Sequence, residues 1–160
     1  MSNQMFFFEI IKEKKYLIKL LYYFVLLFAI SSCKSGPEKL QYTKDSCAFC
    51  KMQLMDTKYG AELITEKGKV YKFDDAGCML NYEKQDLGSQ KVSQELVIDY
   101  SNPGQLINAA SAYHIKCAGA KSPMGSDIAT FEKEETLNKY IQQLQGEKIS
   151  WDAIKNSFNK

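Results

Sequence analysis

The sequence predicts an α+β fold in which a duplicated ββα unit forms one small domain. Strand-like segments come in pairs, and a segment with helix-start and helix-stop signals follows each pair. The second half of the chain also aligns with the first when Val70 is placed on Ile128, a shift of 58 residues. Paired strands with helices packed against them are typical of α+β folds.

The first unit consists of a hairpin and a helix. Residues 59–65 and 70–73 predict two strands, and the turn between them, Glu66-Lys67-Gly68-Lys69, contains glycine. Asp74-Asp75 then supplies an N-cap for a helix that runs to about Gln85 and that Gly88 ends.

The second half repeats this order. Residues 96–100 predict a strand, and residues 112–117 and 128–131 predict two further strands that pair with each other. A helix is expected over residues 132–145, ending at Gly146, and a short terminal helix over residues 148–158. The shift of 58 residues matches Val70 with Ile128, Phe73 with Phe131, Asp74 with Glu132, Met79 with Leu137 and Tyr82 with Tyr140.

Residues 1–32 are predicted to be a lipoprotein signal peptide. Four lysines precede the apolar run 20–30, which at eleven residues is shorter than the roughly 20 that a membrane-spanning helix needs. Ile30-Ser31-Ser32-Cys33 resembles the lipobox of bacterial lipoproteins, which implies cleavage before Cys33 and lipidation of Cys33. An uncleaved signal anchor is the alternative.

This division predicts three parts: the signal peptide, a lipidated cysteine with a polar tether over residues 33–44, and a metal-binding domain over residues 45–160. We expect a periplasm-facing protein that is held on the inner or the outer membrane by its lipid. Residues 1–32 carry four of the 21 basic and two of the 19 acidic residues, so the remainder is formally neutral. No arginine is present, and nucleic-acid binding is therefore not expected.

Soft metal ligands are concentrated in Cys47-Ala48-Phe49-Cys50-Lys51-Met52, a C-x-x-C-x-M motif. Thiolate and thioether sulfur select Cu(I) over harder ions. Met124 lies between Pro123 and Gly125, a setting typical of a tight turn rather than of core packing. Met55 and Met79 are expected in the core. The sulfur atoms of this motif and of the turn predict a copper site at Cys50, Met52 and Met124, with Cys47 as a further candidate ligand.

The other sulfur and nitrogen ligands fit less well. Cys78 follows the predicted cap at a helix N-terminus, so it is either an accessory sulfur of the site or a small buried residue. Cys117 and His114, the single histidine, are not expected to face the site, and this argues against a four-ligand zinc centre. Two further alternatives are a tethered thiol–disulfide oxidoreductase that uses Cys47 and Cys50, and an interaction module with disulfide bonds.

Four motifs in order carry a family resemblance: the C-x-x-C-x-M motif, Phe73-Asp74-Asp75-Ala76-Gly77-Cys78-Met79-Leu80, Val97-Ile98-Asp99-Tyr100, and Ser122-Pro123-Met124-Gly125-Ser126 followed by Ala129-Thr130-Phe131. With the lipobox, they resemble the NosL family of lipoprotein copper chaperones. The resemblance extends from about Ser46 to Gln145. Lys51 departs from it, because the family usually has glycine there.

The resemblance implies two ββα units and a non-enzymatic protein that binds Cu(I) and delivers it for maturation of nitrous oxide reductase or a related copper protein. It implies two partners, a copper-accepting apo-enzyme and its ABC-transporter accessory complex. Carried over residue by residue, the copper ligands fall on Cys50, Met52 and Met124, and Cys47 matches a cysteine found in some members.

Overall fold

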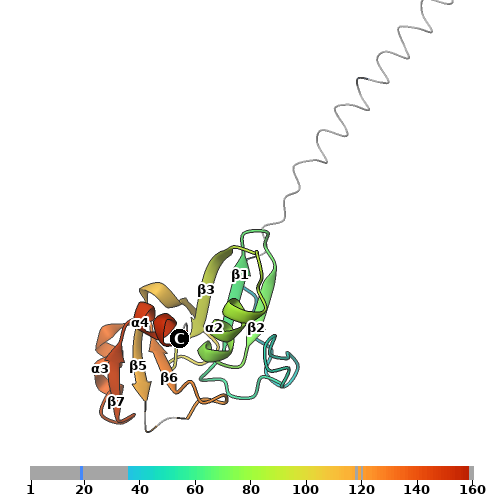
Figure 1. Ribbon diagram of the computed structural model, residues 1–160. Helices are drawn as coiled ribbons and strands as arrows, with labels where there is room; N and C mark the ends of the chain where they lie inside the picture. The colour runs from blue at the N-terminus through green and yellow to red at the C-terminus, as the bar shows by residue number, and fades with distance from the viewer. Residues whose placement is uncertain (1–18, 20–35, 118, 120, 159–160) are drawn as a thin grey trace, which may run out of the picture. The chain divides into compact units, whose positions relative to one another are not determined.

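The computed structural model describes Lys19, residues 36–117, Gly119 and residues 121–158. The chain divides into two units, Met1–Lys34 and Ser35–Lys160, and the fold described below belongs to the second (Figure 1). The predicted signal peptide, apart from Lys19, and Cys33 lie outside the described residues. Among the residues that are described, no helix has both the length and the apolar character needed to cross a membrane.

The first half of the domain is a four-stranded antiparallel sheet with a helix against it (Figure 1). The strands lie in the order β2-β1-β3-β4, so that β1 is central and pairs with β2 on one side and β3 on the other. The elements are β1 (Ala61–Thr65), β2 (Val70–Phe73), α2 (Ala76–Gln85), β3 (Val92–Ile98) and β4 (Leu106–Asn108).

The second half is a three-stranded antiparallel sheet in the order β6-β5-β7. A single 3-10 turn connects the two sheets, and a short helix ends the described chain. The elements are η1 (Ala109–Ser111), β5 (Tyr113–Cys117), β6 (Ile128–Phe131), α3 (Glu134–Tyr140), β7 (Gly146–Ile149) and α4 (Trp151–Phe158).

The predicted α+β fold with a duplicated ββα unit is confirmed. In each copy a hairpin is followed by a helix: β1-β2-α2 in the first and β5-β6-α3 in the second. The register also repeats, since Phe73 lies opposite Ala61 and Phe131 lies opposite Tyr113 at the same end of each hairpin. The structure extends the repeat by one strand, because β3 and β7 both return to pair with the first strand of their own unit.

The predicted helix over residues 132–145 was too long. Helix α3 ends at Tyr140, the chain then turns, and Gln145 has a left-handed backbone with φ +46°. Gly146 does not follow the helix as a stop signal but begins strand β7, opposite Cys117. A Cβ atom there would lie 2.1 Å from Ile115 Cγ2, so glycine permits β7 to approach β5.

Two apolar clusters form the core. The larger one packs the first sheet against α2 and α4, and it includes Leu63, Phe73, Met79 and Ile154. The smaller one lies between the second sheet and α3, around residues that include Phe131. Each sheet therefore has its own apolar centre.

The packed domain begins before residue 45. Leu40 is 4% exposed and belongs to the larger cluster, and the Tyr42 hydroxyl donates to the carbonyl oxygen of Tyr59 at 2.9 Å. Part of the segment that the sequence assigned to a polar tether therefore packs against the fold, because its apolar side chains find a place beside β1.

Gly146→Ala tests the close approach of β7 to β5. We expect a loss of about 1–3 kcal/mol in the free energy of unfolding, because the new methyl group overlaps Ile115 and Lys116. Urea unfolding measures it. Gly36→Ala is the control, since no atom lies within 4 Å of the added Cβ. Equal stability of the two variants would contradict the packing described here.

Candidate metal centre

The C-x-x-C-x-M motif forms a closed loop beside the hairpin β1-β2. The Cys47 N–H donates to the Met52 carbonyl oxygen at 2.8 Å, and the Lys51 N–H donates to the Cys47 carbonyl oxygen at 3.0 Å. The Ala48 N–H donates to the Lys72 carbonyl oxygen on β2 at 2.8 Å. Because backbone hydrogen bonds close the loop and attach it to the sheet, its sulfur ligands are held in a fixed frame.

Lys51 has a left-handed backbone with φ +66°. Glycine adopts this conformation without strain because it has no Cβ, which agrees with the glycine that the family resemblance leads us to expect here. The Lys51 ammonium donates to the Ala48 carbonyl oxygen within the same loop. The positive charge is therefore directed to the loop backbone.

Three cysteines come together at this loop. The sulfur atoms of Cys47, Cys50 and Cys78 all lie within 4.8 Å of one another. Cys47 and Cys78 are 1% and 2% exposed, and Cys50 is partly exposed. Cys78 is placed by the first turn of α2, where its N–H donates to the capping carboxylate of Asp75 at 2.8 Å. The arrangement offers three soft ligands to one metal ion from two separate segments of the chain.

Hydrogen bonds within the thiol cluster shift the pKa values of its cysteines in different directions. The Cys78 thiol and the backbone N–H groups of Cys50, Asp74 and Phe49 donate to the Cys47 sulfur and lower its pKa, although burial opposes this. The pKa of Cys78 is raised, because its thiol donates to Cys47 and because burial disfavours its charge. Burial also raises the pKa of Cys50. One thiolate, on Cys47, is the form that this geometry favours.

A buried carboxylate adds to the negative potential around the cluster. Asp74 is 3% exposed, and burial raises its pKa to about 6. It accepts a hydrogen bond from the Met55 N–H, whereas its Oδ1 atom has no hydrogen-bond partner among the described residues. Acidic neighbours favour a cation in the cluster over an anion.

The two predicted methionine ligands lie at the surface. Met52 is 49% exposed and Met124 is 40% exposed, which makes them two of the exposed large apolar side chains in the described part of the chain. Met79 is fully buried, as predicted, whereas the expectation of a core position for Met55 was wrong, because it is 63% exposed on the loop that follows the motif. The close cluster of sulfurs is thus formed by cysteines, with Met52 two residues beyond Cys50.

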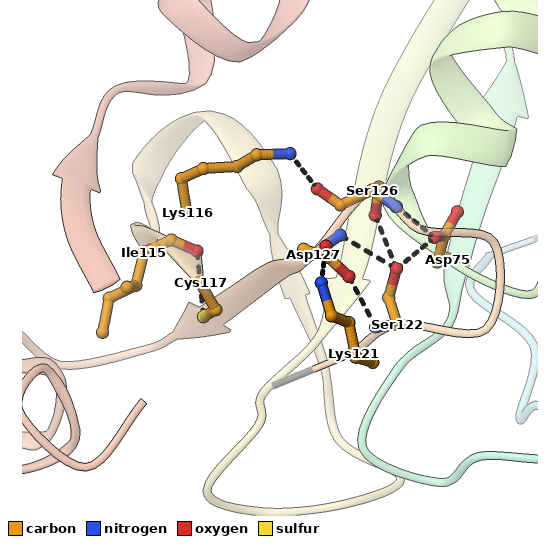
Figure 2. Close-up of polar contacts among 8 residues, drawn as sticks. All are labelled: Asp75, Ile115, Lys116, Cys117, Lys121, Ser122, Ser126 and Asp127. Carbon is orange, nitrogen blue, oxygen red and sulfur yellow. Dashed lines mark hydrogen bonds and ion pairs between the residues drawn. The ribbon is translucent and has the colours of Figure 1, made fainter. Parts of the chain in front are cut away.

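The loop that carries Met124 is fixed to the start of α2 (Figure 2). The Ser122 hydroxyl donates to Asp75 Oδ2 at 2.7 Å, and the Ser126 N–H approaches the same oxygen at 3.4 Å. The Gly125 N–H donates to the Ser122 carbonyl oxygen at 3.1 Å and closes the turn. Met124 therefore belongs to a defined turn that is bonded to the helix of Cys78.

His114 and Cys117 do not belong to the thiol cluster. The His114 ring is 2% exposed, its two nitrogens bond Thr130 Oγ1 and the Ala109 carbonyl oxygen, and it stacks on Trp151. Cys117 packs in the smaller apolar core. Sequence reasoning left Cys78 as either an accessory sulfur or a small buried residue. The signal for its place in the thiol cluster was the cap at Asp74-Asp75, which puts a thiol in the first helical turn.

Lys51→Gly tests the backbone strain in the loop. Compared with Lys51→Ala, we expect Lys51→Gly to be more stable by about 1 kcal/mol, because alanine keeps the left-handed strain and glycine removes it. Both variants lose the lysine contact with Ala48, so their difference isolates the backbone term. Thermal unfolding of the reduced protein gives the comparison, and a more stable alanine variant would rule the strain out.

Comparisons with known proteins agree with this fold. The NosL family model matches residues 39–158. The crystal structure of the copper chaperone NosL from Shewanella denitrificans has a similar fold, with a TM-score of 0.62 and 22% sequence identity over 74% of this chain and 94% of that one. No curated protein matches the sequence. The family match supports the expectation that the chain is not an enzyme. With its family model spanning most of the sequence and its fold shared with a solved member, the chain belongs to the NosL family.

Proposed function

We propose that this protein is a membrane-anchored Cu(I) metallochaperone. The observation that carries the proposal is the cluster of three cysteine sulfurs within 4.8 Å of one another, in a chain that belongs to the NosL family. The solved structure with the similar fold is named as a copper chaperone. Cu(I) is the cargo of this site, and it is held for transfer rather than kept as a permanent cofactor.

The donor set favours Cu(I) over zinc. The cluster offers thiols alone, and two or three soft sulfurs satisfy Cu(I). A structural zinc site is almost always four-coordinate, with nitrogen or sulfur ligands. The histidine of the chain is engaged on both ring nitrogens away from the cluster, so it is not free to complete such a site.

The exposure of the sulfurs supports a route for release. Cys47 and Cys78 are buried, Cys50 is partly exposed, and Met52 and Met124 are at the surface. In our proposal Cu(I) passes by ligand exchange between thiolate and thioether sulfurs, because a neutral thioether holds the ion less strongly and yields it to a partner's ligand. Met52 and Met124 are the ligands that a partner would meet first.

We propose that the chaperone passes Cu(I) to an acceptor protein. The acceptor is apo-nitrous oxide reductase or a related copper protein, reached through its ABC-transporter accessory complex, as the family resemblance implies. Lipidation of Cys33 would keep the chaperone on the periplasm-facing side of the membrane.

Thiol–disulfide exchange is the weaker alternative. Catalytic C-x-x-C motifs need an exposed thiol with a lowered pKa. Here the thiol with the lowered pKa, Cys47, is 1% exposed, and burial raises the pKa of the more accessible Cys50. The properties that nucleophilic attack requires are divided between the two cysteines.

A Cu(I) titration of the full chain in detergent, under anaerobic and reducing conditions and against a competing chelator, tests the proposal. We expect one tight equivalent that weakens roughly tenfold or more in each of Cys47→Ser, Cys50→Ser and Cys78→Ser, because each removes a soft ligand. The matched control is Cys117→Ser, a cysteine buried in the other core, which should bind as the unsubstituted protein does.

Two results would count against the chaperone. Binding no tighter in the unsubstituted chain than in the triple serine variant would reject a copper site at the thiol cluster. Equal weakening by Cys117→Ser would show that the losses report general damage to the fold rather than removal of ligands.

A further inference from the structure

We propose that Asp75 is a positioning residue for the metal centre, and that it joins the helix of Cys78 to the turn of Met124. This inference rests on the proposed copper function and concerns how the two halves of the site are held together. Asp75 is fully buried, and its carboxylate has two oxygens with separate partners. Figure 2 shows the carboxylate between the start of α2 and the turn of Ser122 and Ser126.

The first oxygen serves the cysteine. Asp75 Oδ1 accepts the Cys78 N–H at 2.8 Å and thereby caps α2. This bond fixes the backbone of Cys78, from which the thiol side chain extends. The first oxygen therefore sets where the third thiol of the cluster begins.

The second oxygen serves the methionine turn. Asp75 Oδ2 accepts the Ser122 hydroxyl at 2.7 Å and is approached by the Ser126 N–H at 3.4 Å, on the two sides of Met124. The Ser122 oxygen also accepts the Asp127 N–H at 3.0 Å, and the Ser122 and Ser126 hydroxyls lie 3.1 Å apart. These bonds form one connected network, shown in Figure 2, that ends on a single buried carboxylate.

Close packing supports the same contact. A Cβ atom on Gly77 would lie 2.7 Å from Ser126 Cβ and 3.2 Å from the Phe158 ring. The turn thus lies directly against Gly77, the residue before Cys78. Within four residues, Asp75 caps the helix, Gly77 leaves space for the turn because it has no side chain, and Cys78 supplies a proposed metal ligand.

The duplicated unit provides an internal comparison. The shift of 58 residues places Asp75 on Lys133, which is the N-cap position of α3. Lys133 makes no side-chain capping bond, yet α3 forms. The fold of the unit therefore does not require a carboxylate at this position. Burying one costs free energy unless it is bonded, and in the first unit its bonds reach Cys78 and the Met124 turn.

Asp75→Ser separates the two roles. Serine is as good an N-cap as aspartate, so the bond to the Cys78 N–H is kept, but its single short oxygen cannot also hold Ser122. Partners of this kind change metal affinity by about ten- to a hundredfold. We expect a loss in that range for Cu(I), with the thiol cluster intact.

A double-mutant cycle with Met124→Ala shows whether Asp75 acts through Met124. Chelator competition on the full chain in detergent, with Cu(I) alone as the ligand, gives the four affinities. If Asp75 positions Met124, Asp75→Ser and Met124→Ala each weaken binding, and the double variant is no weaker than Met124→Ala. Ser122→Ala, which leaves the cap untouched, should reproduce the loss of Asp75→Ser in part.

Methionine methyl NMR gives a readout that a purely structural role would not change. We expect the Met124 methyl resonance to shift on addition of Cu(I) in the unsubstituted chain and to shift less in Asp75→Ser. Additive losses in the cycle, an unchanged affinity in Asp75→Ser, or no effect of Met124→Ala would each overturn the proposal. Absence of Cu(I) binding in the unsubstituted chain would instead reject the copper function itself.

Discussion

The buried hydrogen bonds of the Asp75 carboxylate connect the parts of this protein that matter for its proposed chemistry. One oxygen fixes the first turn of α2, where Cys78 begins, and the other fixes the turn around Met124. Burying a carboxylate costs free energy that hydrogen bonds to its oxygens offset, so the helix start and the turn together stabilise buried Asp75. The proposed metal centre therefore does not depend on the C-x-x-C-x-M loop alone.

The electrostatic surroundings of the thiol cluster are consistent with binding of a cation. Asp74 and Asp75 are buried next to the helix that carries Cys78, and Cys47 is stabilised as a thiolate by hydrogen bonds from Cys78 and from backbone N–H groups. The lysines of the loop and of β2 bond other groups. Lys51 bonds the Ala48 carbonyl oxygen, and Lys72 pairs with Glu38 and Asp45. A soft monovalent cation would enter a site with sulfur ligands and negative potential.

The two repeats contribute differently to the site. In the first unit, residues 66–69 connect the hairpin strands, whereas in the second the connection extends over residues 118–127 and includes Met124. The longer connection reaches the start of α2 in the first unit. The two units thus share a similar frame, but the first carries a capped cysteine and the second carries a methionine turn.

Local patterns in the sequence were enough to determine the α+β class, the repeated hairpin and helix, the cap at Asp75 and the soft character of the ligands, because each depends on neighbouring residues. The tertiary structure decided what depends on contacts between distant segments. Cys78 joins Cys47 and Cys50 because α2 packs beside the loop, and no spacing in the chain shows this. Gly146 resembled a helix stop, but its close contact with Ile115 makes it the start of a strand. Leu40 lies in a segment that the sequence assigned to a polar tether, but in the structure it packs into the larger apolar cluster. Periodicity and capping are local, whereas sulfur clusters, close strand approaches and buried carboxylate networks exist only after the chain has folded.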